Sequence, residues 1–240
     1  MRTLVIPIAG NSRRFFDAGY SSVKYKLPAF KKKSILWNIL SYINRDQKLI
    51  IILNKKYNDK KWLEKTLFDL KFSYHEIIEI ADTDGQLTSV LIGLKGSTIV
   101  DDNDELLIYN GDTIRHIPFD VDFKGISGVI EVFKKEGEHW SFTDNLGRVK
   151  IVREKERISD YCSTGLYGFS SVSLFFEYAV KSEKFRGEKF IAPIYNKLIE
   201  DGFKVYSFLS DADSFTLCGT PSEYELNFRE ISAQQKKIKF

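Results

Sequence analysis

The sequence predicts an α/β fold in which helices flank both faces of a mixed, mostly parallel β-sheet. Two observations predict this class. Short apolar runs of strand length recur along the chain, and amphipathic stretches of helix length separate them through the first 112 residues. Such alternation is typical of parallel sheets, because a helix usually makes each crossover between neighbouring strands. The 240 residues suit one large α/β domain, so residues 1–240 are expected to form a single domain.

The first half of the chain, about residues 1–112, supplies the parallel part of the predicted sheet. Its expected strands are residues 3–8, 48–53, 75–80 and 105–109. Its expected helices are residues 34–43, 57–70 and 86–94. Ser34 is a favoured N-cap residue, so it should mark the start of the first of these helices.

The pattern changes in the second half, about residues 113–240. The stretches that look like strands there are residues 127–133, 139–142, 148–153, 165–169, 204–208 and 214–217. Helical stretches are residues 172–180 and 190–200. The segment Thr220-Pro221-Ser222-Glu223 combines a capping box with proline at the first helical position, so it should start the last helix.

Composition argues against several classes of protein. Thirty-six basic and 33 acidic residues give a net charge of +3, whereas nucleic-acid binding usually needs a stronger and clustered bias. The two cysteines, Cys162 and Cys218, give no disulfide framework and no zinc spacing. The first apolar run stops at Gly10, which is too short for a signal peptide or a membrane span. We therefore expect a cytoplasmic protein with no nucleic-acid or membrane partner.

The first candidate site is the loop Ala9-Gly10-Asn11-Ser12-Arg13, which follows the first predicted strand. A loop of small residues at this place can turn consecutive backbone N–H groups toward an anion such as a triphosphate. Arg13 would add a planar fork for phosphate oxygens. The loop is neither a Walker A motif nor a GxGxxG fingerprint, and an ordinary strand-to-helix turn explains it equally well.

A resemblance to a known family, carried by this loop and the segment after it, favours the anion-binding loop over the ordinary turn. The loop AGNSRRF and the later VKYKLP resemble the glycine-rich loop and the Pro-Lys-Pro-Leu-x-Pro-like segment of the nucleotidylyltransferases, which include the sugar-nucleotide pyrophosphorylases. The resemblance implies a Rossmann-like fold of the nucleotide-diphospho-sugar-transferase type. It also implies that Lys24 contacts the phosphates, while Lys26, Lys32 and Lys33 are charges of the loop or rim. Val23 stands where the family has a proline.

Two further segments match the family in the same order. The resemblance implies that Gly85, Gln86 and Thr88 bind the nucleobase, and a glutamine amide can both donate to and accept from a base edge. It implies that Gly111 contacts the nucleotide and that Asp112 holds Mg²⁺ at the end of a buried strand. The alternatives are an Asp-Gly turn before a helix for the first segment and a surface turn for the second.

A departure concerns the second metal aspartate of the family, which stands shortly before a Gly-Thr pair. Leu217 occupies that position here, before Cys218-Gly219-Thr220. The metal would then rest on Asp112, phosphates and water, or take help from Asp211 or Asp213. Mg²⁺ often keeps several waters, so a site with one carboxylate is chemically acceptable.

The acceptor half carries a Glu-Lys pair followed by a Gly-x-Tyr-x-Phe-like strand, as in the family. The implied acceptor-binding residues are Trp140, Glu154, Lys155, Thr164 and Gly165, and Lys155 would contact the acceptor phosphate. The segment His139-Trp140-Ser141-Phe142 and the stretch 154–169 are similar to small capsule-associated members such as the phosphoglutamine cytidylyltransferases. A charged loop that leads into a strand is the alternative for the Glu-Lys pair.

The implied function is transfer of a nucleoside monophosphate from an NTP, with CTP favoured, to a small phosphorylated acceptor, with release of pyrophosphate. The acceptor would be phosphoglutamine or a sugar phosphate, the cofactor Mg²⁺, and the setting capsule or surface-polysaccharide synthesis. Two other classes stay open. A glycosyltransferase of similar fold would usually carry Asp-x-Asp where Asn110-Gly111-Asp112 stands. A nucleotide-binding protein without catalysis would be consistent with Leu217.

Overall fold

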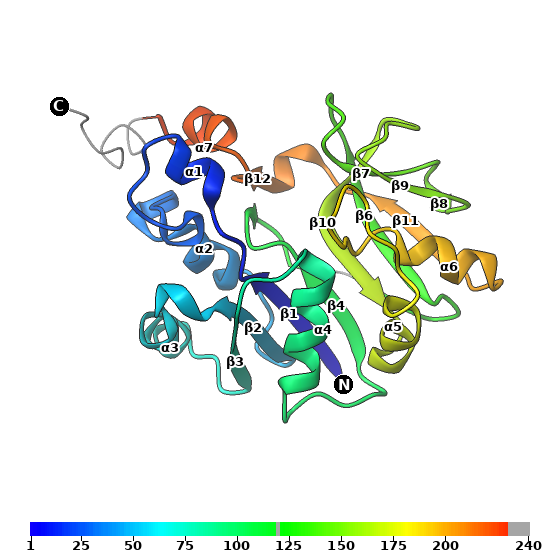
Figure 1. Ribbon diagram of the computed structural model, residues 1–240, viewed down its shortest axis with the longest axis horizontal. Coiled ribbons are helices and arrows are strands. Elements are labelled where there is room, and N and C mark those ends of the chain that lie inside the picture. The colour runs from blue at the N-terminus through cyan, green and yellow to red at the C-terminus, as the bar shows by residue number, and fades with distance from the viewer. Residues whose placement is uncertain (119–120, 230–240) are drawn as a thin grey trace.

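The computed structural model describes residues 1–118 and 121–229, and Figure 1 shows a mixed β-sheet with helices packed on both sides. Ten strands of the described residues form this sheet, and the main path runs β3-β2-β1-β4-β10-β6-β11-β8. The expected α/β class, with a mostly parallel first half, is confirmed. None of the described helices is long and apolar enough to cross a membrane.

The first half forms the parallel part of the sheet, with β1 between β2 and β4, and β3 beyond β2. Its strands are β1 (Arg2–Ile8), β2 (Lys48–Asn54), β3 (His75–Ile80) and β4 (Glu105–Tyr109). Its helices are α1 (Arg13–Asp17), α2 (Ile35–Ser41), α3 (Lys60–Asp69) and α4 (Gln86–Gly96). The Ser34 side chain accepts a hydrogen bond from the Trp37 N–H, as its predicted role as N-cap requires. The short helix α1 was not predicted.

The second half adds mostly antiparallel strands to the same sheet. Its strands are β5 (Thr113–Arg115), β6 (Gly128–Lys134), β7 (Ser141–Thr143), β8 (Gly147–Arg148), β9 (Val152–Glu154), β10 (Tyr161–Phe169), β11 (Val205–Leu209) and β12 (Phe215–Leu217). Its helices are α5 (Val172–Ala179), α6 (Ile194–Glu200) and α7 (Pro221–Asn227). Strand β10 runs antiparallel to both β4 and β6, and so joins the two halves. Strands β5 and β12 form a separate pair.

Two expected elements differ from the prediction for identifiable reasons. The expected strand 148–153 is divided, because β8 pairs with β11 whereas β9 pairs with β7. The expected helix 190–200 begins only at Ile194, after Pro193. Proline disfavours a helical conformation in the residue before it, so Ala192 and the residues upstream of it do not join the helix. The capping box at the start of α7 is present as predicted.

The core lies on both faces of the sheet, as the alternation of side chains along β1 shows. Leu4 and Ile6 belong to the cluster that includes residues of α2 and α3. Val5, on the opposite face, belongs to the cluster that includes residues of α4, α5 and α6. Burial on both faces is what a central parallel strand requires, and it explains why the sequence of β1 is almost wholly apolar.

A buried ion pair lies at the end of the sheet opposite the loop of residues 9–13. The Lys48 Nζ atom lies 2.6 Å from Asp104 Oδ2, and the Thr3 hydroxyl donates to the same oxygen at 2.8 Å. Asp104 is 2% exposed. The pair links the start of β2 to the residue just before β4, and thereby ties the two strands that flank β1.

We expect Asp104→Ala to lower the free energy of unfolding by about 3–5 kcal/mol, because it leaves the buried Lys48 ammonium without its carboxylate. Urea denaturation at neutral pH measures this change. Asp102→Ala is the matched control, since Asp102 is exposed and should give a change within about 0.5 kcal/mol. A loss for Asp104→Ala no larger than that of the control would show that the pair contributes nothing.

Candidate active site

Two adjoining cavities lie where β1 and β4 end. The first cavity, of about 590 Å³, is lined by residues 9–13 and by Lys24, Gly85 and Gln86, among others. The second cavity, of about 440 Å³, is lined by residues of the second half that include Trp140 and Lys155. The residues that line both cavities are Arg14, Gln86, Asn110, Asp112, Glu188, Phe190 and Gly219. A ligand that spans the two cavities would therefore pass Asp112.

The loop of residues 9–13, which we call the phosphate loop after its predicted role, has contacts on both sides. Ser12 adopts the left-handed conformation with φ of 49°, and its hydroxyl accepts a hydrogen bond from the Lys24 N–H at 3.1 Å. The Asn11 carbonyl accepts a hydrogen bond from the Tyr57 hydroxyl at 2.8 Å. Such strain in a residue other than glycine is often found at functional sites. The predicted residues Ala9, Gly10, Asn11, Ser12 and Arg13 all line the first cavity.

Both arginines of the loop are available to a ligand. Arg13 is mostly exposed, and its nearest acidic partner is Asp17 at 3.7 Å. Arg14, which the sequence reasoning passed over, lines both cavities. Because α1 begins at Arg13, neighbouring residues of its first turn can line different cavities. The sequence did not predict this helix, so it could not assign Arg14 to the second cavity.

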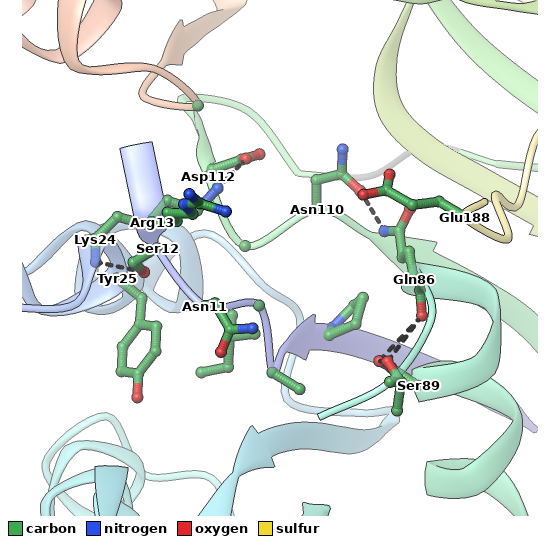
Figure 2. A pocket seen from close by; sticks show the side chains of 18 of the residues that line it. Asn11, Ser12, Arg13, Lys24, Tyr25, Gln86, Ser89, Asn110, Asp112 and Glu188 are labelled. Carbon is green, nitrogen blue, oxygen red and sulfur yellow. Dashed lines mark hydrogen bonds and ion pairs between the residues drawn. The ribbon is translucent and has the colours of Figure 1, made fainter. Parts of the chain in front are cut away.

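Lys24 and Asp112 form the central ion pair of the site, with Nζ 2.5 Å from Oδ2 (Figure 2). The Lys24 side chain is 24% exposed and the Asp112 side chain 21% exposed, so a ligand can reach both. The structure thus joins the predicted phosphate lysine to the predicted metal carboxylate. Lys26, in contrast, pairs with Asp59 at 2.6 Å, and the hydroxyl of the buried Tyr25 donates to the same carboxylate at 2.7 Å.

The base segment, residues 84–88, begins α4. The Gln86 side-chain amide donates to Asn110 Oδ1 at 2.6 Å, as Figure 2 shows, and both residues line both cavities. Gly85 and Gln86 line the first cavity. Thr88 is not among the described residues that line either cavity, and its hydroxyl donates to the Asp84 carboxylate.

A loop between α5 and α6, residues 184–190, packs against the base segment, and we call it the strap. The Lys189 N–H donates to the Asp84 carbonyl at 2.9 Å, and the Lys189 carbonyl accepts from the Leu87 N–H at 3.1 Å. The Lys184 ammonium lies 2.8 Å from Asp84 and, together with the Thr88 hydroxyl, lowers the pKa of Asp84 to about 2. A Cβ on Gly85 would lie only 2.4 Å from the Lys189 oxygen, so this close approach requires glycine.

The strap also reaches the second cavity. Glu188 and Phe190, which flank Lys189, line both cavities. The Lys155 Nζ atom lies 3.9 Å from Glu188 Oε2 and 4.1 Å from the centre of the Phe190 ring. The strap was missed from the sequence, because residues 184–189 read as a charged loop and carry no motif.

The predicted acceptor residues gather mostly in the second cavity. Trp140, Glu154, Lys155 and Thr164 line it. Lys155 has a φ of 54°, and its N–H donates to the Trp140 carbonyl at 2.8 Å. Burial raises the pKa of the Glu154 carboxyl, against the opposing effects of the Ser141 hydroxyl and the Lys155 charge. The Ser141 hydroxyl donates to Glu154 at 2.5 Å.

Two of the predicted acceptor residues have structural contacts of their own. The buried Thr164 hydroxyl donates to Glu131 at 2.5 Å, and Glu131 also pairs with Arg115 at 2.5 Å. Gly165 is outside the described lining of both cavities. With φ of 91°, it allows Asn110 to pack against its Cα, where a Cβ would lie 2.5 Å from Asn110 Nδ2.

The position of the missing family aspartate is clear in the structure. Leu217 pairs with Thr113 across β12 and β5, and it lines the second cavity as an apolar side chain. Asp211 and Asp213 precede β12, at its other end, and neither is among the described residues that line a cavity. The expectation that they might assist the metal therefore has no support in the geometry.

A carboxylate that the sequence reasoning did not assign to the site does lie there. Glu223, the third residue of α7, lines the second cavity. A Cβ built on Gly219 would lie 3.3 Å from Asp112 Oδ2 and 3.3 Å from Glu223 Oε2. The capping box already explains Glu223 in the sequence, so no further signal marked it.

These charges make the two cavities suited to different parts of one reaction complex. Arg13, Arg14 and Lys24 offer positive charge beside the phosphate loop, where a polyanion would need it. Lys155 offers a second, separate cation in the other cavity. Asp112 stands between them and can bind a cation.

Comparison with solved structures gives relatives that match nearly the whole chain. A nucleoside-diphosphate-sugar pyrophosphorylase from Vibrio cholerae RC9 is 31% identical, with a TM-score of 0.86, over 94% of this chain and 99% of its own. A putative glucose-1-phosphate thymidylyltransferase from Bacillus anthracis has 17% identity and a TM-score of 0.71, with 100% and 97% covered. The inositol-1-phosphate CTP transferase from T. maritima has 16% identity and a TM-score of 0.69, with 99% and 97% covered. No protein-family model and no curated protein matches the chain.

We expect Gly85→Ala to weaken ligand binding in both cavities and to destabilise the protein by about 1–3 kcal/mol, because φ of 142° is essentially restricted to glycine and the new Cβ meets the strap. Thermal unfolding and calorimetric NTP binding measure the two effects. Gly96→Ala is the control, since its Cβ would make only an ordinary contact with Ile78 at 3.6 Å. Equal behaviour of the two variants would contradict the role given to the strap.

Proposed function

This chain belongs to the nucleotidyltransferase family that includes the nucleoside-diphosphate-sugar pyrophosphorylases, and we propose that it transfers a nucleoside monophosphate from an NTP to a small phosphorylated acceptor. The observation that carries the proposal is the place of Asp112. It lines both cavities, pairs with the phosphate lysine Lys24, and lies between the phosphate loop and the cavity that holds Lys155. The reacting phosphates would meet at this carboxylate.

The proposed step is a direct in-line displacement. An oxygen of the acceptor phosphate forms a bond to the α-phosphorus, and the bond from that phosphorus to the bridging oxygen breaks. Pyrophosphate leaves with the electron pair of that bond. A phosphate oxygen is already ionised near neutral pH, so the reaction needs positioning and charge compensation more than a general base.

Each part of the site would have one task in this step. Arg13 and Lys24 would compensate the charge of the triphosphate, and Gln86 would bind the base edge. Lys155 would bind and orient the acceptor phosphate in the second cavity. Asn110 holds the Gln86 amide through the 2.6 Å hydrogen bond and would keep it directed at the base.

The residues present fit Mg²⁺ with Asp112 as its carboxylate ligand. No group of three or more His, Cys, Asp or Glu side chains that could hold a metal occurs in the described part of the chain, so phosphates and water would complete the coordination. Gly219 leaves open the space beside the Asp112 carboxylate, where a Cβ would lie 3.3 Å from Oδ2. The bound ion would neutralise phosphate charge and make the α-phosphorus more electrophilic.

The choice of substrates is a finer part of the proposal. We favour CTP as the donor and phosphoglutamine or a sugar phosphate as the acceptor, in capsule or surface-polysaccharide synthesis in the cytoplasm. The support is the similarity of residues 139–142 and 154–169 to the small capsule-associated members of the family. The second cavity is compatible with a small acceptor, since its volume is about 440 Å³.

A grid of NTPs against phosphorylated acceptors, read by pyrophosphate release, tests the function. We expect release only when an NTP and a suitable acceptor are both present, with the highest rate for CTP. Transfer from a nucleotide sugar in place of an NTP would indicate a glycosyltransferase. Binding of NTP without turnover across the grid would favour a nucleotide-binding protein without catalysis.

We expect Asp112→Asn to reduce transfer by about a hundredfold or more, because the amide keeps the size of the side chain but removes the charge that would hold Mg²⁺. Initial rates at saturating NTP and Mg²⁺ measure the loss, and circular dichroism checks that the fold survives. Near-normal activity of a folded Asp112→Asn variant would exclude the proposed ligand role.

Lys155→Ala should distinguish the roles of the two cavities. NTP binding should stay nearly unchanged, because Arg13, Lys24 and the phosphate loop are intact. Acceptor-dependent transfer should fall by about a hundredfold, because the attacking oxygen loses its charge partner and its orientation. Calorimetry of NTP binding beside initial-rate kinetics shows the pattern. An equal loss of NTP affinity would place Lys155 in the nucleotide cavity, and no effect on either would remove it from the site.

A further inference from the structure

The Glu223 carboxylate faces Asp112 across Gly219. Each of the two carboxylates has an oxygen 3.3 Å from the point that a Cβ on Gly219 would occupy, so these oxygens are at most twice that distance apart. Both residues and Gly219 line the second cavity. A side chain at residue 219 would fill the space between the two charges, and glycine keeps it open.

Packing holds Glu223 in this place. The Thr220 N–H donates to Glu223 Oε2 at 2.9 Å, and the Glu223 N–H donates to the Thr220 hydroxyl at 3.2 Å. The next residue, Tyr224, is fully buried and donates its hydroxyl to the Pro28 carbonyl at 2.6 Å. The cap uses one hydrogen bond of the carboxylate, which can accept several more.

The charges of Glu223 and Asp112 act on the same small region. Cys218 lies between β12 and Gly219, and its N–H donates to the Asp112 carbonyl at 2.8 Å. In this region Lys24 is the cation that balances Asp112, and it is the residue that a triphosphate would draw away.

We propose that Glu223 is the second carboxylate of the Mg²⁺ site. It would replace the family aspartate whose position Leu217 occupies in this chain. It would accept a hydrogen bond from a water molecule that the ion retains, while Asp112 binds the ion. Mg²⁺ gives up its waters reluctantly, so a site with one direct and one water-mediated carboxylate suits it. This inference rests on the proposed function, because it concerns the same metal.

The capping box provides a sharp test, because glutamine satisfies it as well as glutamate does. Glu223→Gln should therefore leave the melting temperature unchanged and remove only the charge. We expect its Mn²⁺ affinity, measured on the full chain by electron paramagnetic resonance of free Mn²⁺, to fall about tenfold, as is usual for residues that bind metal-bound water. Asp112→Asn should lose more.

Glu225→Gln is the matched control, because it removes the same charge two residues along α7. Glu225 accepts a hydrogen bond from Tyr20 at 3.0 Å, which glutamine can also accept, and it is outside the described lining of both cavities. Its Mn²⁺ affinity should equal that of the wild type. An equal loss of Mn²⁺ affinity in Glu225→Gln would show that the effect is general electrostatics, and this would overturn the proposal.

The remaining outcomes separate this inference from the proposed function. Wild-type Mn²⁺ affinity in Glu223→Gln, with a loss in Asp112→Asn, would overturn the role of Glu223 and leave Asp112 as the ligand. Wild-type Mn²⁺ affinity in both variants would contradict the proposal that a metal binds at Asp112. If Glu223→Gln unfolds, Gly219→Ala decides, because its Cβ enters the space between the two unaltered carboxylates. Undiminished Mn²⁺ binding by Gly219→Ala would then overturn the proposal.

Discussion

The ion pair between Lys24 and Asp112 is the interaction on which the site depends. It joins the segment after the phosphate loop to the turn after β4, over a distance of 2.5 Å. In the free protein each charge compensates the other, so neither is left unpaired in a half-buried place. Under the proposed function, a triphosphate would pair with Lys24 and a divalent cation with Asp112, so the two ligands together would replace both partners of the ion pair.

The pairing of the strands makes this ion pair possible. Parallel pairing of β1 with β4 brings their carboxyl ends to the same edge of the sheet, so the loop after β1 faces the turn after β4. The approach is close enough to require glycine, because a Cβ on Gly111 would lie 2.1 Å from Ile8 Cγ2. Antiparallel pairing of β10 with β4 then places Thr164 and Gly165 beside the same turn, where the Asn110 N–H donates to the Gly165 carbonyl at 3.0 Å.

Local patterns were enough to predict the parallel strands and the helix caps at Ser34 and Thr220, because each has a short-range cause. The strap could not be predicted, since its role comes from backbone hydrogen bonds between Lys189 and a segment about a hundred residues earlier. Glu223 was hidden for another reason: its capping role explains it locally, and its place beside Asp112 depends on how α7 packs. Thr88 matched the base-binding motif of the family, yet its hydroxyl donates a hydrogen bond to Asp84.

Under the proposed function, the strap would make the base specificity and the acceptor specificity of the protein structurally inseparable. Lys189 is bonded to the base segment, and its neighbours Glu188 and Phe190 contact the lysine of the acceptor cavity. A change in residues 84–88 that admits a different base would shift the strap, and with it the surroundings of Lys155. Exchange of substrate preference between relatives would therefore succeed only when residues 84–88 and 184–190 are transplanted as one unit, although they lie far apart in the chain.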